Sequence, residues 1–404
     1  MKFAHLADCH IGGWREPKLT KIGIEAFHKA IDACIKGNTA FILISGDLFN
    51  TSLPAIELIK ETASILKKAK NKGISCYIIP GSHDFSPSGK TMLDVLEKSG
   101  LVENVVKLNK NKLSFTIDKT NTKITGLYGK KGALESIDYK TLDKTNLEKE
   151  QGFKIFMFHT LFNELKPDNF IIDNLDTIES LPKNFNYYAG GHPHFIYRKE
   201  YSNGIIAYPG PLFPNNFLEL EELKHGGFYL VDVKDGKISL NHIPVKIKDV
   251  ISLTISAENK TPEEVEKEIL KSLEKKDVKD KIITLRIEGT LSTGKPSDIN
   301  FKEILNKFKE AYFVLKNTNK LRNKETAELW TEGNSTDEIE LKMIKENLGK
   351  SKLFMEEEKI AREFMHVLDK EKDEGERSFD FEERIIKDID KLFGIKDVAK
   401  ENKA

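Results

Sequence analysis

Acidic and imidazole side chains recur at five places in the first half of the chain, each time directly after a short apolar run. They are Asp8, His10, Asp47, His83, Asp84, His159, His192 and His194. A mixture of carboxylate and imidazole ligands suits Mn²⁺, Fe or Zn²⁺ in a catalytic site, whereas structural zinc sites often use cysteine thiolates. These groups outnumber the ligands of one ion. We therefore expect two ions about 3.5–4 Å apart, an arrangement that suits phosphoester hydrolysis.

The alternative interpretation of the same residues is a buried polar network without metal. A lone Asp-x-His pair arises often by chance, so Asp8 and His10 alone would carry little weight. Five motifs in this order favour a metal site. His5 lies within the first apolar run and is expected in the core, and the side chain of Cys9 is expected on the opposite face of the strand end.

Short β-rich runs precede all five polar clusters. The runs are Lys2–Ala7, Phe41–Ser45, Ser75–Pro80, Phe153–Phe158 and Tyr187–Gly191. Between the first and the second of these runs, apolar residues recur at helical spacing, as at Ile22, Ala26 and Ala30. Strands that alternate with helices predict a layered α/β fold. In open α/β sheets ligands gather beyond the carboxyl ends of the strands, which is where all five clusters lie.

The length of 404 residues favours two or three domains. The distribution of strand-like and helical segments predicts a strand-rich first domain over residues 1–245 and a small α+β domain over residues 246–322. A helical, highly charged C-terminal region follows over residues 323–404. In the second domain, strand-like Val250–Ile255 and Ile282–Ile287 flank a helix whose N-cap is predicted at Thr261, with proline at the first helical position.

Composition excludes several classes of protein. The 64 Lys+Arg residues balance 64 Asp+Glu, so contacts to nucleic acid would have to come from a local basic patch. No apolar stretch approaches the roughly 18 residues of a membrane span, and the N-terminus lacks the apolar core of a signal peptide, so we expect a cytoplasmic protein without a membrane partner. Three cysteines without a CxxC pair argue against a disulfide framework.

The ordered motifs resemble those of the calcineurin-like metallophosphoesterases. The resemblance depends on Asp8-x-His10, Gly46-Asp47, Gly81-x-His83-Asp84, His159 and Gly191-His192-x-His194. The segments HLADCHIG, ISGDLFNTS and IAYPGPLF are similar to the archaeal Mre11 nucleases, and the likeness covers roughly residues 1–230. This resemblance implies a layered β-sandwich flanked by helices, a small α+β capping domain and a helical C-terminal tail.

The same resemblance implies a function and its partners. It implies a nuclease with two Mn²⁺ per subunit that acts on DNA ends, single-stranded DNA or hairpins in double-strand break repair, with Mg²⁺, Fe and Zn²⁺ as alternative metals. It also implies a homodimer, formed by helices predicted over Pro54–Lys72 and Met92–Glu97. A Rad50-type ATPase would bind the C-terminal region, where Ile360, Phe364 and Leu368 recur at helical spacing. A helical subdomain that packs on itself is an equally good alternative for this region.

Carried over by position, six side chains would hold the two ions. Asp8, His10 and His194 would hold the first ion, and His159 and His192 would hold the second. Asp47 would bridge the two ions. His83 would face the scissile phosphate as proton donor or transition-state stabiliser, with Asp84 orienting its ring. Ser82 stands where most relatives have an asparagine ligand of the second ion, and its hydroxyl is shorter and a weaker ligand. Asn50 stands where some relatives have histidine.

Basic residues just beyond the strand ends are the predicted DNA contacts. They are Arg15, Lys90, Lys130 and Lys131. Such contacts would neutralise phosphate charge without reading sequence, as the processing of DNA ends requires. For each of them a solvated loop is an equally good alternative.

Two rival functions are kept beside the nuclease. One is a phosphodiesterase for nucleotides or lipids, although small substrates need neither a second domain nor a long charged tail. The other is a scaffold that binds DNA ends and the ATPase but cuts poorly, because Ser82 replaces the usual ligand.

Overall fold

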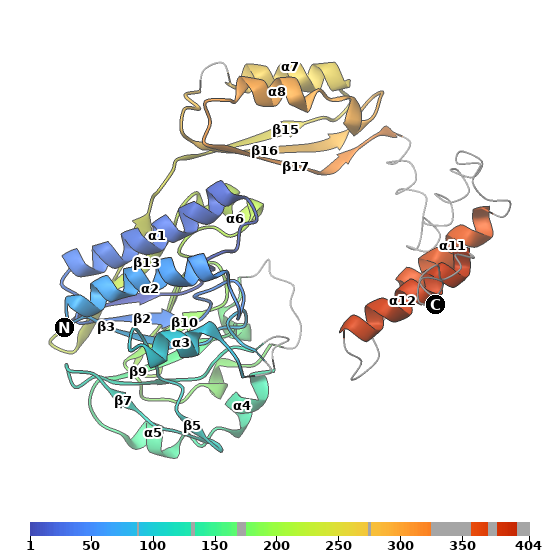
Figure 1. The fold of residues 1–404 in the computed structure, drawn as a ribbon. Helices are drawn as coiled ribbons and strands as arrows, with labels where there is room; N and C mark the ends of the chain where they lie inside the picture. Colours follow the sequence, from blue (N-terminus) through green and yellow to red (C-terminus); the bar gives the residue numbers. More distant parts are fainter. Residues whose placement is uncertain are drawn as a thin grey trace, which may run out of the picture. The chain divides into compact units, whose positions relative to one another are not determined.

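The computed structural model (Figure 1) describes residues 1–86, 89–130, 134–167, 175–273, 276–324, 357–370 and 378–393. Two six-stranded sheets dominate its N-terminal part. The first sheet has the order β14 (Lys237–Val245), β13 (Gly226–Lys234), β1 (Lys2–Leu6), β2 (Phe41–Ser45), β3 (Ser75–Ile79) and β4 (Glu103–Asn104). The second has the order β11 (Ile196–Tyr201), β12 (Gly204–Pro209), β10 (Tyr187–Gly191), β9 (Lys154–His159), β8 (Lys123–Gly126) and β7 (Thr116–Ile117). A separate ribbon pairs β5 (Leu108–Asn109) with β6 (Lys112–Leu113).

The central strands of each sheet are parallel. In the first sheet β1, β2, β3 and β4 pair in parallel, and in the second β8, β9, β10 and β12 do so. The register places Leu6 opposite Ile44 and Ile44 opposite Ile78, so these three strands end together. In the second sheet Gly191 lies opposite His159. The polar clusters that follow neighbouring strands therefore share one edge of each sheet.

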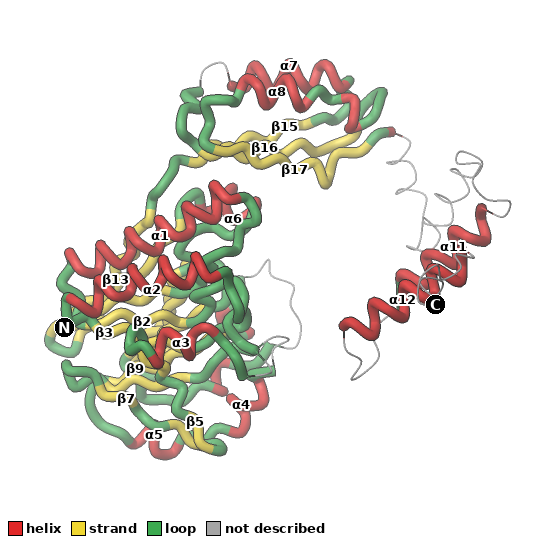
Figure 2. The backbone as a smooth tube through the Cα atoms, in the orientation of Figure 1, coloured by secondary structure: helices red, strands yellow, loops and turns green. Residues whose placement is uncertain are grey.

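Helices cover the outer face of each sheet, as the red helices over yellow strands in Figure 2 show. They are α1 (Pro17–Lys36), α2 (Ile56–Asn71), α3 (Met92–Lys98), α4 (Ser136–Thr141), α5 (Thr145–Lys149) and α6 (Phe217–Leu223), with 3-10 turns at Asn163–Leu165 and Ile178–Ser180. Helices α1, α2 and α3 share a buried apolar core with the first sheet, and α4 and α5 share one with the second.

Alternation along β1 explains the layers. Ala4 and Leu6 belong to the core under the helices, whereas Phe3 belongs to the core between the sheets. There the ring of Phe3 stacks on Phe41 with centroids 5.0 Å apart and meets the edge of Tyr187, from the second sheet, at 5.3 Å. The predicted α/β fold, a layered β-sandwich flanked by helices, is confirmed.

A smaller sheet follows in the chain. It comprises β15 (Val250–Ser256), β16 (Ile282–Thr290) and β17 (Phe313–Arg322), accompanied by α7 (Pro262–Leu273), α8 (Phe301–Lys307) and a 3-10 turn at Pro296–Asp298. The predicted N-cap at Thr261 is present. Its Oγ1 accepts a hydrogen bond from the Glu264 N–H over 3.3 Å, and Glu264 Oε2 accepts one from the Thr261 N–H over 2.8 Å.

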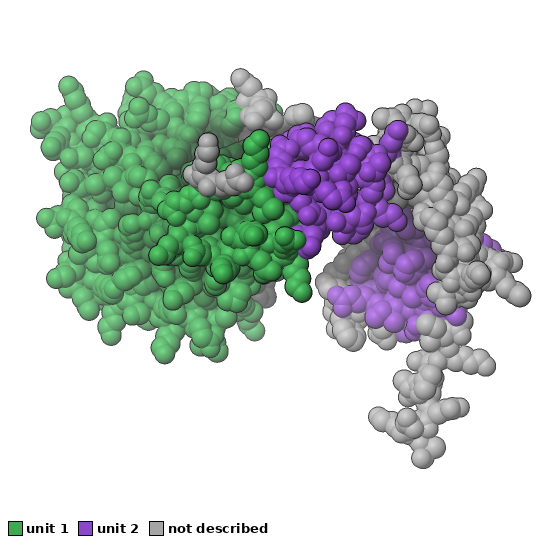
Figure 3. Space-filling view, turned by 90° about the horizontal axis from the view of Figure 1, so that it is seen from above, with its two compact units in different colours: residues 1–254, 269–286, 301–317 green, residues 255–268, 287–300, 318–404 purple. Residues whose placement is uncertain are grey.

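The chain divides into two compact units, which Figure 3 distinguishes by colour. The first comprises residues 1–254, 269–286 and 301–317, and the second comprises residues 255–268, 287–300 and 318–404. The predicted domain boundaries at residues 245 and 322 stay predictions. None of the described helices is long and apolar enough to cross a bilayer.

Two helices are described near the C-terminus, α11 (Glu357–Leu368) and α12 (Ser378–Phe393). The ring centroids of Phe364 and Phe393 lie 5.5 Å apart, and Lys370 Nζ lies 2.9 Å from Asp388 Oδ2. As the chain runs on from Phe364 to Lys370, the contacted residue in α12 moves back from Phe393 to Asp388, so the helices are antiparallel. The described part of the C-terminal region is therefore helical, as predicted.

Candidate metal centre

Nine of the predicted site residues lie at the carboxyl ends of five parallel strands. Asp8 and His10 follow β1, Asp47 follows β2, Ser82, His83 and Asp84 follow β3, His159 ends β9, and His192 and His194 follow β10. The ligand atoms of six of them form three overlapping groups whose members lie within 4.8 Å of one another: Asp8, His10 and His194; His10, Asp47 and His83; and Asp8, Asp47 and His159. The fold thus brings side chains from distant segments into one cluster.

Four of these residues hold a left-handed backbone, which is uncommon for residues other than glycine. The φ angle is +49° at Asp8, +40° at His10, +51° at Asp47 and +96° at His192. Such conformations cost on the order of 1–3 kcal/mol each and cluster at functional sites. Backbone hydrogen bonds hold the turns, because the amides of Asp8 and His10 donate to the carbonyls of Gly46 and Asp47 over 3.2 and 2.9 Å.

Two imidazoles of the first group face each other. His10 Nε2 lies 3.0 Å from His194 Nε2, which lies 3.8 Å from Asp8 Oδ1. Both Nδ1 atoms meet oxygens: that of His10 lies 3.1 Å from Asn50 Oδ1, and that of His194 lies 2.8 Å from Glu219 Oε1. An acceptor at Nδ1 fixes the ring hydrogen there. The two rings therefore aim their Nε2 atoms at each other beside a carboxylate, and in their neutral forms they make a donor set that fits a divalent cation.

Asp47 and His159 define the second half of the cluster. His159 Nε2 lies 3.1 Å from Asp47 Oδ2, while its Nδ1 donates to the backbone carbonyl of Ser45 over 2.8 Å. Asp47 Oδ2 also lies 3.6 Å from His10 Nε2, so this oxygen faces ligands of both halves. The ring centroid of His192 lies 5.2 Å from that of His159. The position of Asp47 suits a carboxylate that bridges two ions.

The strand end after β3 supports the Asp47 carboxylate. Ser82 Oγ donates to Asp47 Oδ2 over 3.4 Å, and the backbone N–H of His83 donates to Oδ1 over 2.8 Å. The approach requires glycine at position 81, since a Cβ on Gly81 would lie 2.2 Å from Asp47 Oδ1. Ser82 thus contacts the Asp47 carboxylate, and its role as a metal ligand stays a prediction.

Burial and charge set the protonation of the cluster. Burial lowers the pKa of His10 to about 3 and that of His192 to about 4, so both rings are neutral. Burial raises the pKa of Asp8 to about 6. Burial also opposes the charge on Asp47, but His159 and His10 outweigh it and hold the pKa of Asp47 below its ordinary value. Asp47 in turn raises the pKa of His159 against burial. A cation between these two would displace their shared proton, because imidazole ligates metals in its neutral form.

His83 is held beside the cluster by its backbone neighbour. Its Nδ1 donates to the carbonyl of Asn50 over 2.8 Å, which leaves Nε2 as the nitrogen that can exchange a proton with a substrate. Its ring centroid lies 4.8 Å from that of His10. The group that orients His83 is therefore a main-chain carbonyl.

The predicted role of Asp84 in orienting the His83 ring is wrong. The Asp84 carboxylate is buried and accepts three backbone hydrogen bonds, from Leu48 and Phe49 at 3.0 Å each and from Gly81 at 3.2 Å. A carboxylate without solvent needs such donors, and the turn after β2 supplies them. Burial and the charge of Asp47 raise the pKa of Asp84 to about 7. Two of its hydrogen bonds hold the residues that lead to Asn50, whose carbonyl accepts from His83.

The predicted DNA contacts have different surroundings. Arg15 and Lys90 are exposed, on the loops after β1 and β3. Lys130 Nζ lies 2.7 Å from Asp138 Oδ2 and 5.1 Å from the ring centroid of Tyr128. Its charge is therefore already paired, and a phosphate would have to compete with Asp138. Lys131 lies outside the described residues.

Sequence reasoning missed the groups that hold three imidazoles, namely the Asn50 amide, the Ser45 carbonyl and Glu219. Of these three groups, Glu219 lies in a sequence pattern that can be recognised locally. Asn216 and Glu219 have the spacing of a capping box at the start of α6, and Asn216 Oδ1 accepts from the Glu219 N–H over 3.0 Å. That signal predicts a helix start, but not a contact with His194, 25 residues away.

Residues 1–196 match the calcineurin-like phosphoesterase family. This match, the sandwich and the carboxylate–imidazole cluster define the class, and the chain belongs to the calcineurin-like metallophosphoesterases. Within that class it is a metallophosphoesterase of the archaeal Mre11 type.

Three curated relatives support the type. The chain is 28% identical to the DNA double-strand break repair protein Mre11 of Archaeoglobus fulgidus over 288 residues, 68% of this chain and 64% of that protein. It is 31% identical to the protein of that name from Methanococcus maripaludis over 261 residues, 60% and 66% of the two chains. For Thermoplasma acidophilum the identity is 29% over 304 residues, 71% and 77% of the two chains. The chain thus spans slightly less than two thirds of the first two relatives.

Solved structures give a more distant match. A dimetal phosphatase from Danio rerio aligns with 61% of this chain and 96% of its own, at 9% identity and a TM-score of 0.42.

Proposed function

We propose that this protein is a metal-dependent phosphodiesterase that hydrolyses DNA in double-strand break repair. One observation carries the proposal: His10 and His194 aim their Nε2 atoms at each other over 3.0 Å, with Asp8 and Asp47 beside them. Two imidazole nitrogens this close can share one hydrogen in the metal-free protein, and a divalent cation that takes its place would bind both nitrogens and the neighbouring carboxylates. DNA as substrate is supported by the repair proteins to which the chain is 28% and 31% identical.

Bound ions, Mn²⁺ by preference, would supply Lewis acidity and an activated water for attack on phosphorus. Asp8, His10 and His194 would hold the first ion, and Asp47 would bridge to the second. The second ion would be held by His159, with His192 and Ser82 as the further ligands that lie beside it. Asp47 is suited to bridging because its pKa lies below its ordinary value and keeps the carboxylate charged. His83 can give a proton from Nε2 to the leaving oxygen while Nδ1 stays on the Asn50 carbonyl.

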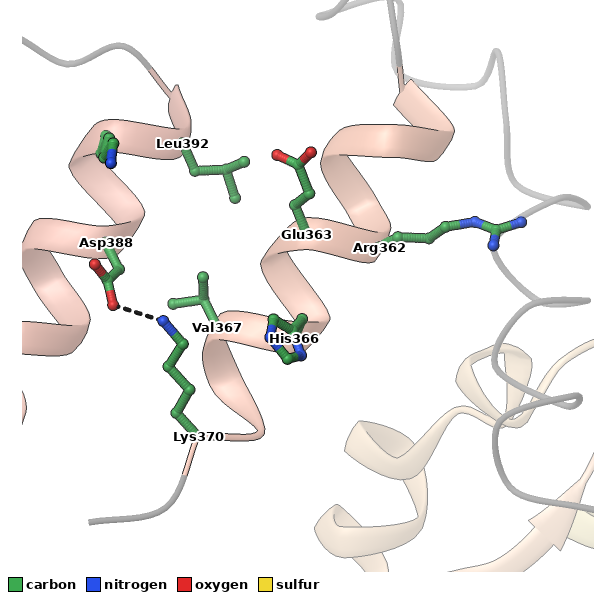
Figure 4. Close-up of a pocket in the computed structure, with 8 residues that line it drawn as sticks. Arg362, Glu363, His366, Val367, Lys370, Asp388 and Leu392 are labelled. Atoms are coloured by element: carbon green, nitrogen blue, oxygen red, sulfur yellow. Dashed lines mark hydrogen bonds and ion pairs between the residues drawn. The ribbon is translucent and has the colours of Figure 1, made fainter. Parts of the chain in front are cut away.

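The antiparallel pair α11 and α12 is the proposed contact for a Rad50-type ATPase. Figure 4 shows Lys370, which lies just after α11, reaching Asp388 of α12, with Val367 between the helices. Val367 is buried, whereas Met365, Leu368 and Ile386 are 40%, 53% and 56% exposed. Exposed apolar side chains on a short two-helix unit suit docking against a helical partner. The residues of the predicted contact before 357 lie outside the described part of the chain.

A homodimer is proposed to form at the starts of α2 and α3. Leu53, Ile56 and Val95 are 63%, 77% and 51% exposed there. The Met92 N–H donates to the Ser52 carbonyl over 3.0 Å, which sets the start of α3 beside the segment before α2. Apolar side chains gathered in this way are typical of an interface between protein copies.

A second candidate function is a DNA-end scaffold with weak catalysis. It is favoured by Ser82, whose hydroxyl already donates to Asp47 Oδ2 over 3.4 Å. A hydroxyl used in this way offers the second ion less than an amide oxygen would.

One assay separates the candidates. Purified protein is incubated with Mn²⁺, and in parallel with Mg²⁺, Fe²⁺ or Zn²⁺, on linear duplex, single-stranded and hairpin DNA and on a small chromogenic phosphodiester. We expect metal-dependent DNA cleavage that EDTA abolishes and His83→Ala weakens. Intact DNA despite bound metal and added ATPase would support the scaffold instead. Cleavage of the small ester alone would support a phosphodiesterase for small substrates.

A further inference from the structure

Glu219 connects the start of α6 to His194, although it lies outside all five ligand motifs. Its Oε1 accepts from His194 Nδ1–H over 2.8 Å, and its Oε2 accepts from the Asn215 N–H over 2.7 Å. The Glu219 side chain is 13% exposed, so solvent screens these contacts little. The carboxylate is therefore firmly placed against the outer nitrogen of a proposed metal ligand.

The loop before α6 is fixed against the first ligand motif. A Cβ on Gly13 would lie 1.9 Å from Asn215 Oδ1, so the two segments are in close contact. Trp14 Nε1 also donates to the Pro214 carbonyl over 2.9 Å. Because this loop positions Glu219, the carboxylate keeps its place relative to the end of β1.

Three imidazoles of the centre are held by acceptors of three kinds. His10 faces the neutral amide of Asn50, and His159 faces the main-chain carbonyl of Ser45. His194 faces a carboxylate. A carboxylate accepts and cannot donate, so it fixes the hydrogen of His194 on Nδ1 and directs the Nε2 lone pair inward. Its charge also makes the ring a stronger donor to a metal.

We propose that Glu219 is a positioning residue that sets the tautomer and donor strength of His194, and thereby makes the ion held with Asp8 and His10 the more tightly bound of the two. The inference rests on the proposed function, because it requires a two-ion centre. The other ion would depend on Ser82, whose hydroxyl is a weak ligand.

A purely structural role of Glu219 is the competing explanation. Asn216 caps α6 by accepting a hydrogen bond from the Glu219 N–H, and this main-chain donor is unchanged by a substitution of the Glu219 side chain. Glu219→Gln therefore keeps the cap but removes the charge. The new amide can also turn its NH₂ toward His194, which would move the ring hydrogen to Nε2 and occupy the metal-binding lone pair. A role in capping alone predicts no change in metal affinity.

The test is a Mn²⁺ titration of metal-free wild type, Glu219→Gln, Glu219→Ala and Glu222→Gln by calorimetry, with Co²⁺ absorption as a second signal. Glu222 is an exposed glutamate of the same helix and provides the matched control. We expect two binding steps in the wild type and in Glu222→Gln. Glu219→Gln should weaken the tighter step about 10–100-fold, alter the Co²⁺ bands and leave the weaker step unchanged. Its metal-free unfolding midpoint should match the wild type.

Two results would overturn the proposed role of Glu219 and leave the proposed function of the protein standing. Both steps could persist at wild-type affinity in Glu219→Gln, or both could weaken equally together with a lower unfolding midpoint. If Glu219→Ala does not fold, Glu219→Gln carries the test. Failure of the wild type to bind Mn²⁺ would instead overturn the proposed function itself.

Discussion

The two halves of the proposed metal centre use the same kinds of ligand but support them differently. In one half, side chains hold the imidazoles, Asn50 for His10 and Glu219 for His194. In the other, the backbone carbonyl of Ser45 holds His159. A substitution can change a side-chain acceptor but not a main-chain carbonyl. The first half is therefore open to tuning by single residues, whereas the second is fixed by the path of β2.

Asp47 belongs to both halves and carries the largest expected effect. Asp47→Asn removes the charge that faces His10 and His159, over 3.6 and 3.1 Å, so neither ion should bind well. We expect hydrolysis to fall by more than about 10⁴-fold, since each ion contributes several kcal/mol to the transition state. Activity assays and Mn²⁺ stoichiometry check this, with exposed Asp94→Asn as control. Two ions bound at wild-type affinity would remove Asp47 from the bridge.

His83 should affect the chemistry without affecting either half. His83→Ala removes a proton donor whose Nδ1 is held by the Asn50 carbonyl, so kcat should fall on the order of 10²–10⁴-fold. Both Mn²⁺ binding steps should remain. The control is His28→Ala, which removes a partly exposed imidazole of α1. Equal kcat for His83→Ala and wild type would exclude His83 from proton transfer.

Ser82 tests the weaker half directly. Ser82→Asn supplies an amide oxygen, so affinity for the second ion should rise by roughly tenfold, the scale on which single changes near metal ligands act. The first step should be unchanged, and Ser82→Ala should show no gain. Calorimetry measures all three proteins. Weaker binding in Ser82→Asn would mean that the serine hydroxyl, through its bond to Asp47, already serves the site best.

His5 tests the frame beneath both halves and should leave the chemistry unchanged. Its Nδ1 lies 2.9 Å from the Tyr187 hydroxyl, so it joins β1 to β10. Burial lowers the pKa of His5 from 6.5 to about 3. Between these values the unfolded chain binds a proton that the folded chain does not, so stability falls as pH falls. The contribution is about 1.4 kcal/mol per pH unit.

The measurement is urea unfolding of the metal-free protein from pH 6 to pH 4. The stability of His5→Gln should decline less steeply than that of the wild type by about 1.4 kcal/mol per pH unit. Using the difference between the slopes removes the contributions of the other titrating groups. Parallel curves would show that His5 is not held neutral in the folded protein.

The sequence predicts the strands and the gathering of ligands well, for a physical reason. Phe41–Ser45 and Tyr187–Gly191 are strands with the predicted bounds, because buried parallel strands need unbroken runs of apolar or small residues. Polar clusters at the ends of such runs then meet at the sheet edge. The two-residue strands β4 and β7 show no period and were not predicted.

Contacts that depend on turn geometry could not be predicted from the sequence. Asp84 was expected to orient His83, but its oxygens serve the amides of the turn after β2. Likewise, nothing local indicates that Lys130 pairs with Asp138 or that Glu219 reaches His194. Each of these pairings is set by how separate segments pack, and a motif contains no information on that.

Anomalous diffraction from Mn²⁺-soaked crystals tests the central claim most directly. We expect two peaks about 3.5–4 Å apart, one among Asp8, His10 and His194 and the other beside His159, with Asp47 between them. The absence of any peak at these residues, or peaks only at other places in the protein, would contradict a two-ion centre.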